Sequence, residues 1–276
     1  MIAFFLGLAL AAPPQTLTYT RPDNAAADDL AAHQFTRWEV KARLYTALPD
    51  VGVFDGSGLK RISVLAMGEQ VRIEEVGAVA NVNDRVDAWY RVEAGWVFGG
   101  DLTPFRWEAD MDGDGEKEVV TLAWLDNFTV RMRVLEPNLR AGAVMQIDVE
   151  PAGNAYVAQQ GAILTAELIS AKEAGIALVH VHLGVEACAD YRDDWIGYQS
   201  PGPVKIGFAR VALSLAGLID PPNESTFEVV FSGKRQTAFV TRSTVEVEGQ
   251  DPVEMTDRYV LRNGVFLLER DGEVSR

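Results

Sequence analysis

The strongest constraint on the fold is the spacing of short apolar runs along the chain. From Trp38 almost to the C-terminus, runs rich in Val, Ile, Tyr and Trp alternate with clusters of Gly, Asp and Pro. Short, evenly spaced runs bounded by turn residues are typical of small β-barrels and β-sandwiches. The sequence therefore predicts a mainly β protein.

Alternation within single runs supports this prediction. Phe128, Val130, Met132 and Val134 share one face of a predicted strand, and the polar residues between them share the other. The same period of two recurs in three later runs, at Met145, Ile147, Val149, Phe227, Val229, Phe231, Tyr259 and Leu261.

Turn and helix signals complete the outline of the predicted fold. Asn263-Gly264 separates two apolar runs near the C-terminus and predicts a β-hairpin, because both residues tolerate positive φ. Only residues 162–174 and 209–219 have a pattern compatible with a helix. The second half of the chain is therefore also expected to be mainly β.

The N-terminus has the features of an export signal. The run MIAFFLGLALAA ends in small residues, and Ala9-Leu10-Ala11 is the small-x-small pattern that signal peptidase recognises. This predicts a signal peptide over residues 1–11 and a periplasmic or extracellular protein. The alternative is a short apolar N-terminus buried in the fold, since the run is too short to span a bilayer. Residues 12–36, with adjacent prolines and an Ala/Asp stretch, are expected to be a linker.

Charge and cysteine content exclude several kinds of partner and site. The 276 residues carry a formal charge of -15, which argues against nucleic acid or an anionic membrane surface as partner. Cys188 is the only cysteine, so the chain forms no intrachain disulfide and no zinc cluster of thiolates. Cations and neutral polymers remain as possible ligands.

Three segments between residues 37 and 106 share the pattern of a known family. Residues 37–42 (RWEVKA) have the form of an opening strand, residues 65–73 (LAMGEQVRI) that of a strand-turn-strand, and residues 89–98 (WYRVEAGWVF) that of a closing hairpin. In these segments the chain resembles the bacterial SH3 family, small barrels found mostly in exported bacterial proteins. The resemblance implies an SH3-like barrel over residues 37–106 that contacts a cell-envelope polymer or protein. Residues 44–49 depart from the family pattern, because the usual asparagine and arginine are absent.

Tyr45, Trp89 and Tyr90 are the candidate ligand-binding residues of this barrel. Tyr and Trp combine an apolar ring face with a polar edge, which suits stacking on a sugar or a peptide. Tyr45 and Tyr90 are expected to be exposed. The alternative is that Trp89 and Tyr90, together with Trp96 and Phe98, fill the barrel core, as large aromatic residues often do.

The sharpest chemical motif is the acidic loop DMDGDGEKE at residues 110–118. Asp110, Asp112 and Asp114 occupy loop positions one, three and five, and a glycine at position six permits the chain to reverse around a hard cation. An EF-hand would need a glutamate at position twelve, which is Thr121 here, and the residues after the loop have the pattern of a strand.

This acidic loop resembles the calcium loop of the FG-GAP or integrin α-type repeat, which runs directly into a β-strand. The resemblance implies a structural calcium ion bound by side-chain oxygens of Asp110, Asp112, Asp114 and Glu118 and by a backbone carbonyl of Glu116. The motif has no second copy in the chain, so a complete propeller is not expected. The alternative is an acidic surface turn in which Asp and Gly serve only turn geometry.

His180 and His182 are a second candidate for metal binding. Two residues apart in a predicted strand, they share one face, and Asp190, Asp193 and Asp194 follow closely. The alternative is a pair of hydrogen-bonded histidines on a sheet face, because no further Cys or His has the spacing of a transition-metal site. Cys188 is expected to act as a small buried hydrophobe.

The predicted function follows from these motifs. The chain has no nucleophile elbow, phosphate loop, zinc-protease motif or dinucleotide fingerprint, so no catalytic activity is expected. We expect a non-catalytic extracytoplasmic binding protein, with an SH3-like barrel followed by a larger antiparallel β domain at residues 107–276. This second domain would be a sandwich or partial propeller stabilised by calcium. The alternative is a cell-envelope hydrolase with its site in residues 120–276.

Overall fold

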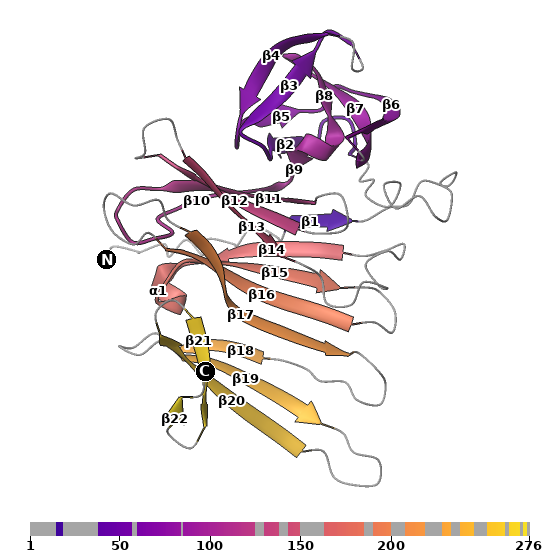
Figure 1. The fold of residues 1–276 in the computed structure, drawn as a ribbon. Coiled ribbons are helices and arrows are strands. Elements are labelled where there is room, and N and C mark those ends of the chain that lie inside the picture. The colour runs from indigo at the N-terminus through magenta and orange to yellow at the C-terminus, as the bar shows by residue number, and fades with distance from the viewer. Residues whose placement is uncertain are drawn as a thin grey trace, which may run out of the picture.

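A computed structural model gives the structure of the protein. It describes residues 15–18, 38–56, 60–83, 85–124, 130–137, 143–149, 163–184, 190–199, 208–218, 228–232, 238–245, 253–262, 265–270 and 273–274. These residues form five antiparallel sheets: two that interleave in sequence between β2 and β9, one of β10–β13, one of β14–β17 joined by β1, and one of β18–β22 (Figure 1). The prediction of a mainly β protein is confirmed. The predicted signal peptide, Cys188 and most of the predicted linker lie outside the described residues.

Residues 38–103, here called the N-terminal unit, form two sheets around one core. The smaller sheet has the order β5-β2-β9 and the larger the order β4-β3-β8-β7-β6. Their strands are β2 (Arg43–Thr46), β3 (Asp50–Phe54), β4 (Arg61–Ala66), β5 (Gln70–Arg72), β6 (Glu75–Val82), β7 (Arg85–Val92), β8 (Gly95–Phe98) and β9 (Leu102–Thr103), with the 3-10 helix η2 (Gly99–Asp101) before β9. Side chains from both sheets meet in the core, including Leu44, Val53 and Tyr90.

The closed barrel expected for this segment is not formed among the described residues. The strands β2, β5 and β9 are short and make a sheet of their own, which packs across the core against the larger sheet without joining its hydrogen-bond ladder. Register shifts in the β3–β4 and β6–β7 pairs further interrupt the larger sheet. The strand content was predicted correctly, and the closure was not.

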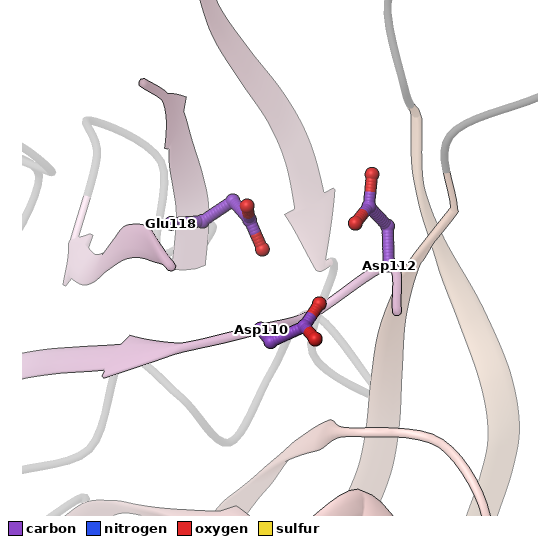
Figure 2. Close-up of side chains that lie close together, drawn as sticks. All are labelled: Asp110, Asp112 and Glu118. Carbon is purple, nitrogen blue, oxygen red and sulfur yellow. The ribbon is translucent and has the colours of Figure 1, made fainter. Parts of the chain in front are cut away.

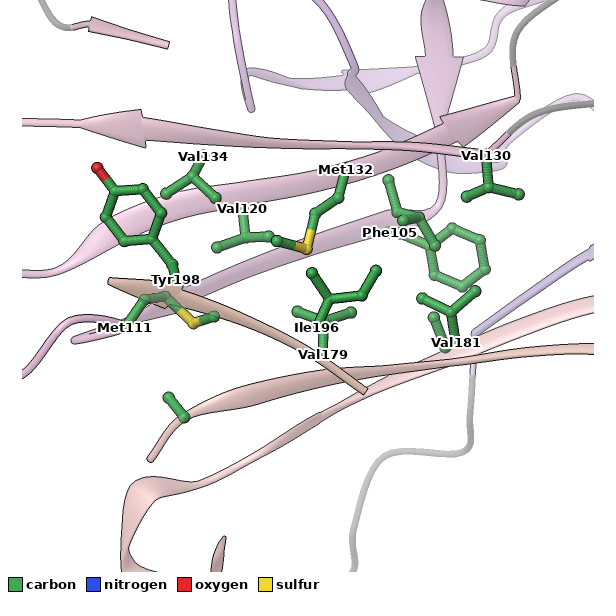
Figure 3. Packing of buried hydrophobic residues seen from close by; sticks show 13 residues of the cluster. Phe105, Met111, Val120, Val130, Met132, Val134, Val179, Val181, Ile196 and Tyr198 are labelled. Carbon is green, nitrogen blue, oxygen red and sulfur yellow. The ribbon is translucent and has the colours of Figure 1, made fainter. Parts of the chain in front are cut away.

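Two larger sheets pack face to face in the middle of the molecule. The first has the order β10-β11-β12-β13 and the second the order β1-β14-β15-β16-β17. Their strands are β10 (Phe105–Ala109), β11 (Glu118–Trp124), β12 (Val130–Glu136), β13 (Ala143–Val149), β1 (Gln15–Thr18), β14 (Ile163–Ile169), β15 (Leu178–Gly184), β16 (Asp190–Gln199) and β17 (Phe208–Leu218). Val130, Met132 and Val134 are buried in the core between them, as the alternation predicted (Figure 3).

The last sheet has the order β18-β19-β20-β21-β22. Its strands are β18 (Glu228–Ser232), β19 (Ala238–Val245), β20 (Val253–Arg262), β21 (Val265–Arg270) and β22 (Glu273–Val274). Arg262 pairs with Val265, so the predicted C-terminal hairpin is confirmed by the pairing of β20 with β21. Phe266 of β21 packs with Leu178 and Trp195 on the outer face of the β14–β17 sheet.

The helical alternatives at residues 162–174 and 209–219 are mostly wrong. Only α1 (Ala171–Ala174) is an α-helix, while residues 163–169 and 208–218 are strands. Both segments have long antiparallel partners in the sheet, and tertiary pairing of this kind overrides weak local helix propensity. None of the helices in the described part of the chain is long and apolar enough to cross a membrane.

The N-terminal unit rests directly on the first of the two middle sheets. The backbone carbonyl of Ala47 accepts hydrogen bonds from Thr121 Oγ1 on β11, at 3.2 Å, and from Arg133 Nη1 on β12, at 3.5 Å. A Cβ atom built at Gly68, whose φ is +76°, would lie 2.7 Å from Cγ1 of Val119. Gly68 thus combines a turn that needs positive φ with a close approach between the two parts.

The core of the N-terminal unit predicts that residues 37–106 fold as a separate fragment and that Tyr90 holds the fragment together. Tyr90 is fully buried, and its hydroxyl accepts a hydrogen bond from Trp38 N at 2.9 Å. Tyr90→Ala removes a buried aromatic ring at a cost of about 3–5 kcal/mol, comparable with the stability of a small domain. The variant should therefore lose the cooperative urea transition of the fragment.

Tyr90→Phe is the matched variant for this experiment, because it removes only the hydroxyl, at a cost of about 1 kcal/mol. It should unfold cooperatively at a lower urea concentration. A parent fragment without a cooperative transition would show that the N-terminal unit needs the middle sheets to fold.

Candidate metal site

The acidic loop connects β10 to β11, and the first pair below it is Ala109 with Glu118. Gly113 and Gly115 adopt φ values of +84° and +95°. Nothing lies within 4 Å of a Cβ atom built at either position, so these two glycines are required by backbone conformation and not by lack of space.

Hydrogen bonds from the backbone to aspartates hold the loop in shape. Asp110 accepts two of them, from Gly113 N to Oδ1 at 2.7 Å and from Gly115 N to Oδ2 at 3.1 Å. Asp112 and Asp114 each accept one from the N–H two residues further on, at 3.1 and 2.8 Å. Contacts of this kind are those of an acidic turn, and they leave each carboxylate with further lone pairs for a cation.

Three of the five predicted ligands converge. Asp110, Asp112 and Glu118 each bring a carboxylate oxygen to within 4.8 Å of the others, and their side chains face one another across the loop (Figure 2). Glu118 is fully buried. Its Oε2 accepts a hydrogen bond from Met111 N at 2.6 Å, whereas its Oε1 is buried without a hydrogen-bond partner. A buried carboxylate oxygen without a donor is costly, and a hard cation would satisfy it.

Asp114 and Glu116 lie outside this converging group. Both side chains are exposed, although the ligand expected from Glu116 was its backbone carbonyl and not its side chain. The carboxylate of Asp114 accepts the N–H of Glu116. The structure thus supports three carboxylates of the predicted set and does not bring the Asp114 carboxylate to them.

Burial and mutual repulsion raise the pKa values of Glu118 and Asp112. Burial raises the pKa of Glu118 to about 7, and the negative charges of Asp112 and Glu136 add to this shift. Burial, with the charges of Asp114 and Asp110, also raises the pKa of Asp112. Without a cation, the group therefore costs free energy whenever it is fully ionised.

Sequence reasoning missed Glu136, which lies at the end of β12. It is 3% exposed, and its Oε2 accepts a hydrogen bond from the hydroxyl of Tyr198 at 2.8 Å. Burial and the charges of the acidic loop raise its pKa. The signal for it was present in the sequence, because Glu136 occupies the next position of the row Val130, Met132 and Val134. A glutamate in a buried apolar row points to a polar function there.

The predicted aromatic platform is not formed by Trp89 and Tyr90. Both side chains are buried, so the expectation that Tyr90 is exposed was wrong. The core alternative holds for Tyr90, which lies in the core between the two sheets, whereas Trp96 is only half-buried. Trp89 makes edge contacts with the rings of Phe54 and Phe98, at centroid distances of 5.2 and 5.6 Å. Trp89 and Tyr90 are neighbours on β7, so their side chains point to opposite faces of the larger sheet. Tyr90 packs in the core between the two sheets, and Trp89 packs on the other face.

Tyr45, the third predicted ligand-binding residue, is half-buried and already engaged. The guanidinium of Arg106 lies 5.6 Å from its ring centroid, and Gln70 Nε2 donates a hydrogen bond to its hydroxyl at 3.3 Å. One ring face is therefore covered by a cation, which leaves at most the other face for stacking on a ligand.

An open hollow of about 820 Å³ lies beside Tyr45, along β2 and β5. Charged side chains of both signs line it: Arg43, Arg72, Glu69, Glu74 and Glu93. Arg43 and Arg72 are directly paired across the two strands, although like charges in this position repel. The hollow therefore offers two adjacent cationic groups, and acidic groups around them, to a polar ligand.

The two histidines lie on β15 as predicted, on the same face. His180 Nδ1 lies 3.2 Å from Oε1 of Glu167, and its ring stacks on Trp195 with a centroid distance of 4.5 Å. These contacts agree with the structural alternative for His180. Asp194 pairs with Val181 and is buried on the opposite face of the sheet, so it cannot join the histidines as a ligand.

The raised pKa of Glu118 predicts the pH dependence of stability in the presence of a chelator. Between pH 4.5 and about 7 the folded protein binds more protons at Glu118 than the unfolded chain does. The free energy of unfolding should therefore fall as the pH rises through this range. In the Glu118→Gln variant this side chain cannot ionise. Its free energy of unfolding, measured by urea unfolding at several pH values, should therefore fall less with rising pH than that of the parent.

Glu93→Gln, which removes an exposed carboxylate of the N-terminal unit, is the control and should leave the fall unchanged. If the curves of Glu118→Gln and the parent ran parallel, ionisation of Glu118 would not limit the stability of the metal-free protein.

Comparisons of the chain with protein-family models, with curated proteins and with solved structures find no match. What is inferred about function therefore rests on the chemistry of the site itself. The feature that most constrains it is the convergence of Asp110, Asp112 and Glu118, because the Glu118 carboxylate is buried and one of its oxygens has no donor.

Proposed function

We propose that the protein is a non-catalytic extracytoplasmic binding protein that holds a structural calcium ion between Asp110, Asp112 and Glu118. The observation that carries the calcium site is the buried Glu118 carboxylate, which faces two further carboxylates and whose Oε1 has no hydrogen-bond partner. A site made only of oxygens suits a hard cation, and flexible carboxylate geometry favours calcium over magnesium. The export signal expected at residues 1–11 is consistent with a calcium-rich compartment.

A structural role suits the position of the site better than a catalytic one. Glu118 begins β11 at the end of the core between the two middle sheets, next to Met111 and Tyr198 of that core. Catalytic metal sites keep an open ligand position in a cleft that admits substrate. A cation buried here would instead fasten the loop to the sheet.

The hollow on the N-terminal unit supports a polar ligand for the binding function. It replaces the aromatic platform, because Trp89 and Tyr90 are buried. Its paired Arg43 and Arg72 can donate hydrogen bonds to carboxylate or phosphate groups, and its glutamates can accept them from hydroxyl and amide groups. A cell-envelope polymer, or an envelope protein with an acidic segment, carries such groups. The resemblance to bacterial SH3 domains points to the same ligand class.

The calcium proposal predicts a rise in the melting temperature of the intact protein. A ligand that binds only the folded state at about a hundred times its Kd adds about 2.7 kcal/mol to stability. Asp112→Asn should lose this response, because Asp112 belongs to the converging group. Calorimetry with calcium and with a chelator measures both proteins.

Asp114→Asn is the matched control for Asp112→Asn. It removes the same charge from the same loop, but from an exposed side chain outside the converging group, so it should keep most of the calcium response. A parent protein whose melting does not respond to calcium would leave the loop as an acidic turn and end the metal proposal.

The binding proposal predicts that the mature protein sediments with purified bacterial cell-wall material. The double variant Arg43→Ala, Arg72→Ala should lose at least half of the bound fraction, because it removes the cationic pair of the hollow. Lys60→Ala, Arg61→Ala removes two exposed cations elsewhere on the N-terminal unit and should bind as the parent does. Equal loss in both double variants would mean that the contact is general electrostatic attraction and not recognition by the hollow.

A further inference from the structure

A second buried carboxylate stands directly opposite Glu118. The β11–β12 register runs from Trp124 with Val130 to Val119 with Leu135. The next position along the two strands therefore places Glu118 opposite Glu136. Directly opposed residues of an antiparallel pair have Cβ atoms about 4.5–5.5 Å apart. The register thus brings Glu136 to the same end of the buried face as Glu118, while its carboxylate lies outside the group of three whose oxygens are within 4.8 Å of one another.

Each of these two carboxylates has one oxygen engaged and one without a partner. Glu118 Oε2 accepts from Met111 N, and Glu136 Oε2 accepts from the Tyr198 hydroxyl. The other oxygen of each, Oε1, is buried and makes no hydrogen bond. These two unsatisfied oxygens come from neighbouring strands, and the same acidic loop acts electrostatically on both groups. A ligand with several positive charges would satisfy both.

A shared proton is the simplest alternative for such a pair. It can relieve the repulsion between Glu118 and Glu136, but it leaves the nearby carboxylates of Asp110 and Asp112 without a shared positive charge. A divalent cation neutralises two charges and binds about six to eight oxygen ligands. This suits a group of carboxylates that come from two strands and a loop.

We propose that Glu136 is a further ligand of the cation, which therefore binds at the junction of β11, β12 and the acidic loop and not in the loop alone. This inference rests on the calcium site proposed above. The Glu136 side chain would then turn toward the three carboxylates that already converge, so that Asp110, Asp112, Glu118 and Glu136 share the cation, and the two glutamates among them are buried.

The position of Tyr198 extends the site to the facing sheet. Tyr198 lies on β16, and its ring is packed in the core between the two sheets (Figure 3). Its hydroxyl donates a hydrogen bond to Oε2 of Glu136. Burial and the bond to Glu136 raise the pKa of this hydroxyl, so it remains a donor. By holding Oε2, Tyr198 leaves Oε1 for the cation. It is a positioning residue, and it couples the site to the packing of the two middle sheets.

The test compares calcium affinities of the full chain by titration calorimetry. Glu136→Gln keeps the shape of the side chain and an acceptor for Tyr198, but removes the charge. It should weaken calcium binding by about 10- to 100-fold. Glu116→Gln removes one charge from an exposed position of the loop and should change the affinity by less than about threefold, since exposed charges are screened by solvent and salt.

Tyr198→Phe tests the positioning role independently of charge. It should weaken calcium binding by about tenfold in the parent, and by much less in the Glu136→Gln background, because both changes act on the same oxygen. A purely structural role of Tyr198 would give the same loss in both backgrounds. If Glu136→Gln does not fold, Tyr198→Phe carries the test, and an unchanged affinity overturns the inference.

The outcomes separate this inference from the proposal on which it rests. A parent protein that binds no calcium removes both. A parent that binds calcium, with Glu136→Gln no weaker than Glu116→Gln, keeps the loop site and removes Glu136 from it. Equal and large losses in these two variants would assign the effect of Glu136 to general charge and also overturn its role as ligand.

Discussion

The rest of the structure depends on the packing of the β10–β13 sheet against the β14–β17 sheet. Each strand must place its apolar row on the inner face, and the period of two does this for Val130, Met132 and Val134 on β12. The same period then carries Glu136 inward at the end of that row. Glu118 arrives in the same way at the start of β11, before Val120. The pleat that builds the apolar core thus also delivers two carboxylates to its rim, where the acidic loop closes over them.

Much of the fold and of the acidic site could be predicted from the sequence, because the signals for them are local. Alternation gives strand β12, and a turn dipeptide gives the β20–β21 hairpin. The spacing of the acidic loop identifies Asp110, Asp112 and Glu118 as neighbours, since a short loop between paired strands leaves little choice of geometry. Glu136 also gives a local signal, because it is a charged residue in a buried apolar row. That row alone does not predict a ligand, since the role of Glu136 depends on the residue opposite it on another strand.

Other features depend on partners far away in the sequence. Tyr90 is of a residue type common in exposed binding sites. In the fold, however, its hydroxyl accepts a hydrogen bond from Trp38 N, 52 residues earlier, and its ring fills a core made by two sheets. Residues 208–218 have a pattern compatible with a helix, and only their long pairing with β16 makes them a strand. Tertiary contacts of this kind decide the conformation wherever local propensity is weak.

The contact at Ala47 gives the arrangement a mechanical meaning. The N-terminal unit stands on one face of β11 and β12, through Thr121 and Arg133, while the carboxylates of Glu118 and Glu136 lie at the end of the other face. If the proposed polymer binds the N-terminal unit, tension on it would reach the middle sheets through the chain connection to β10 and through these contacts with β11 and β12. A cation bound by Glu118 and Glu136 would cross-link β11 and β12 where the N-terminal unit contacts them. Its loss would weaken that link without removing any apolar contact.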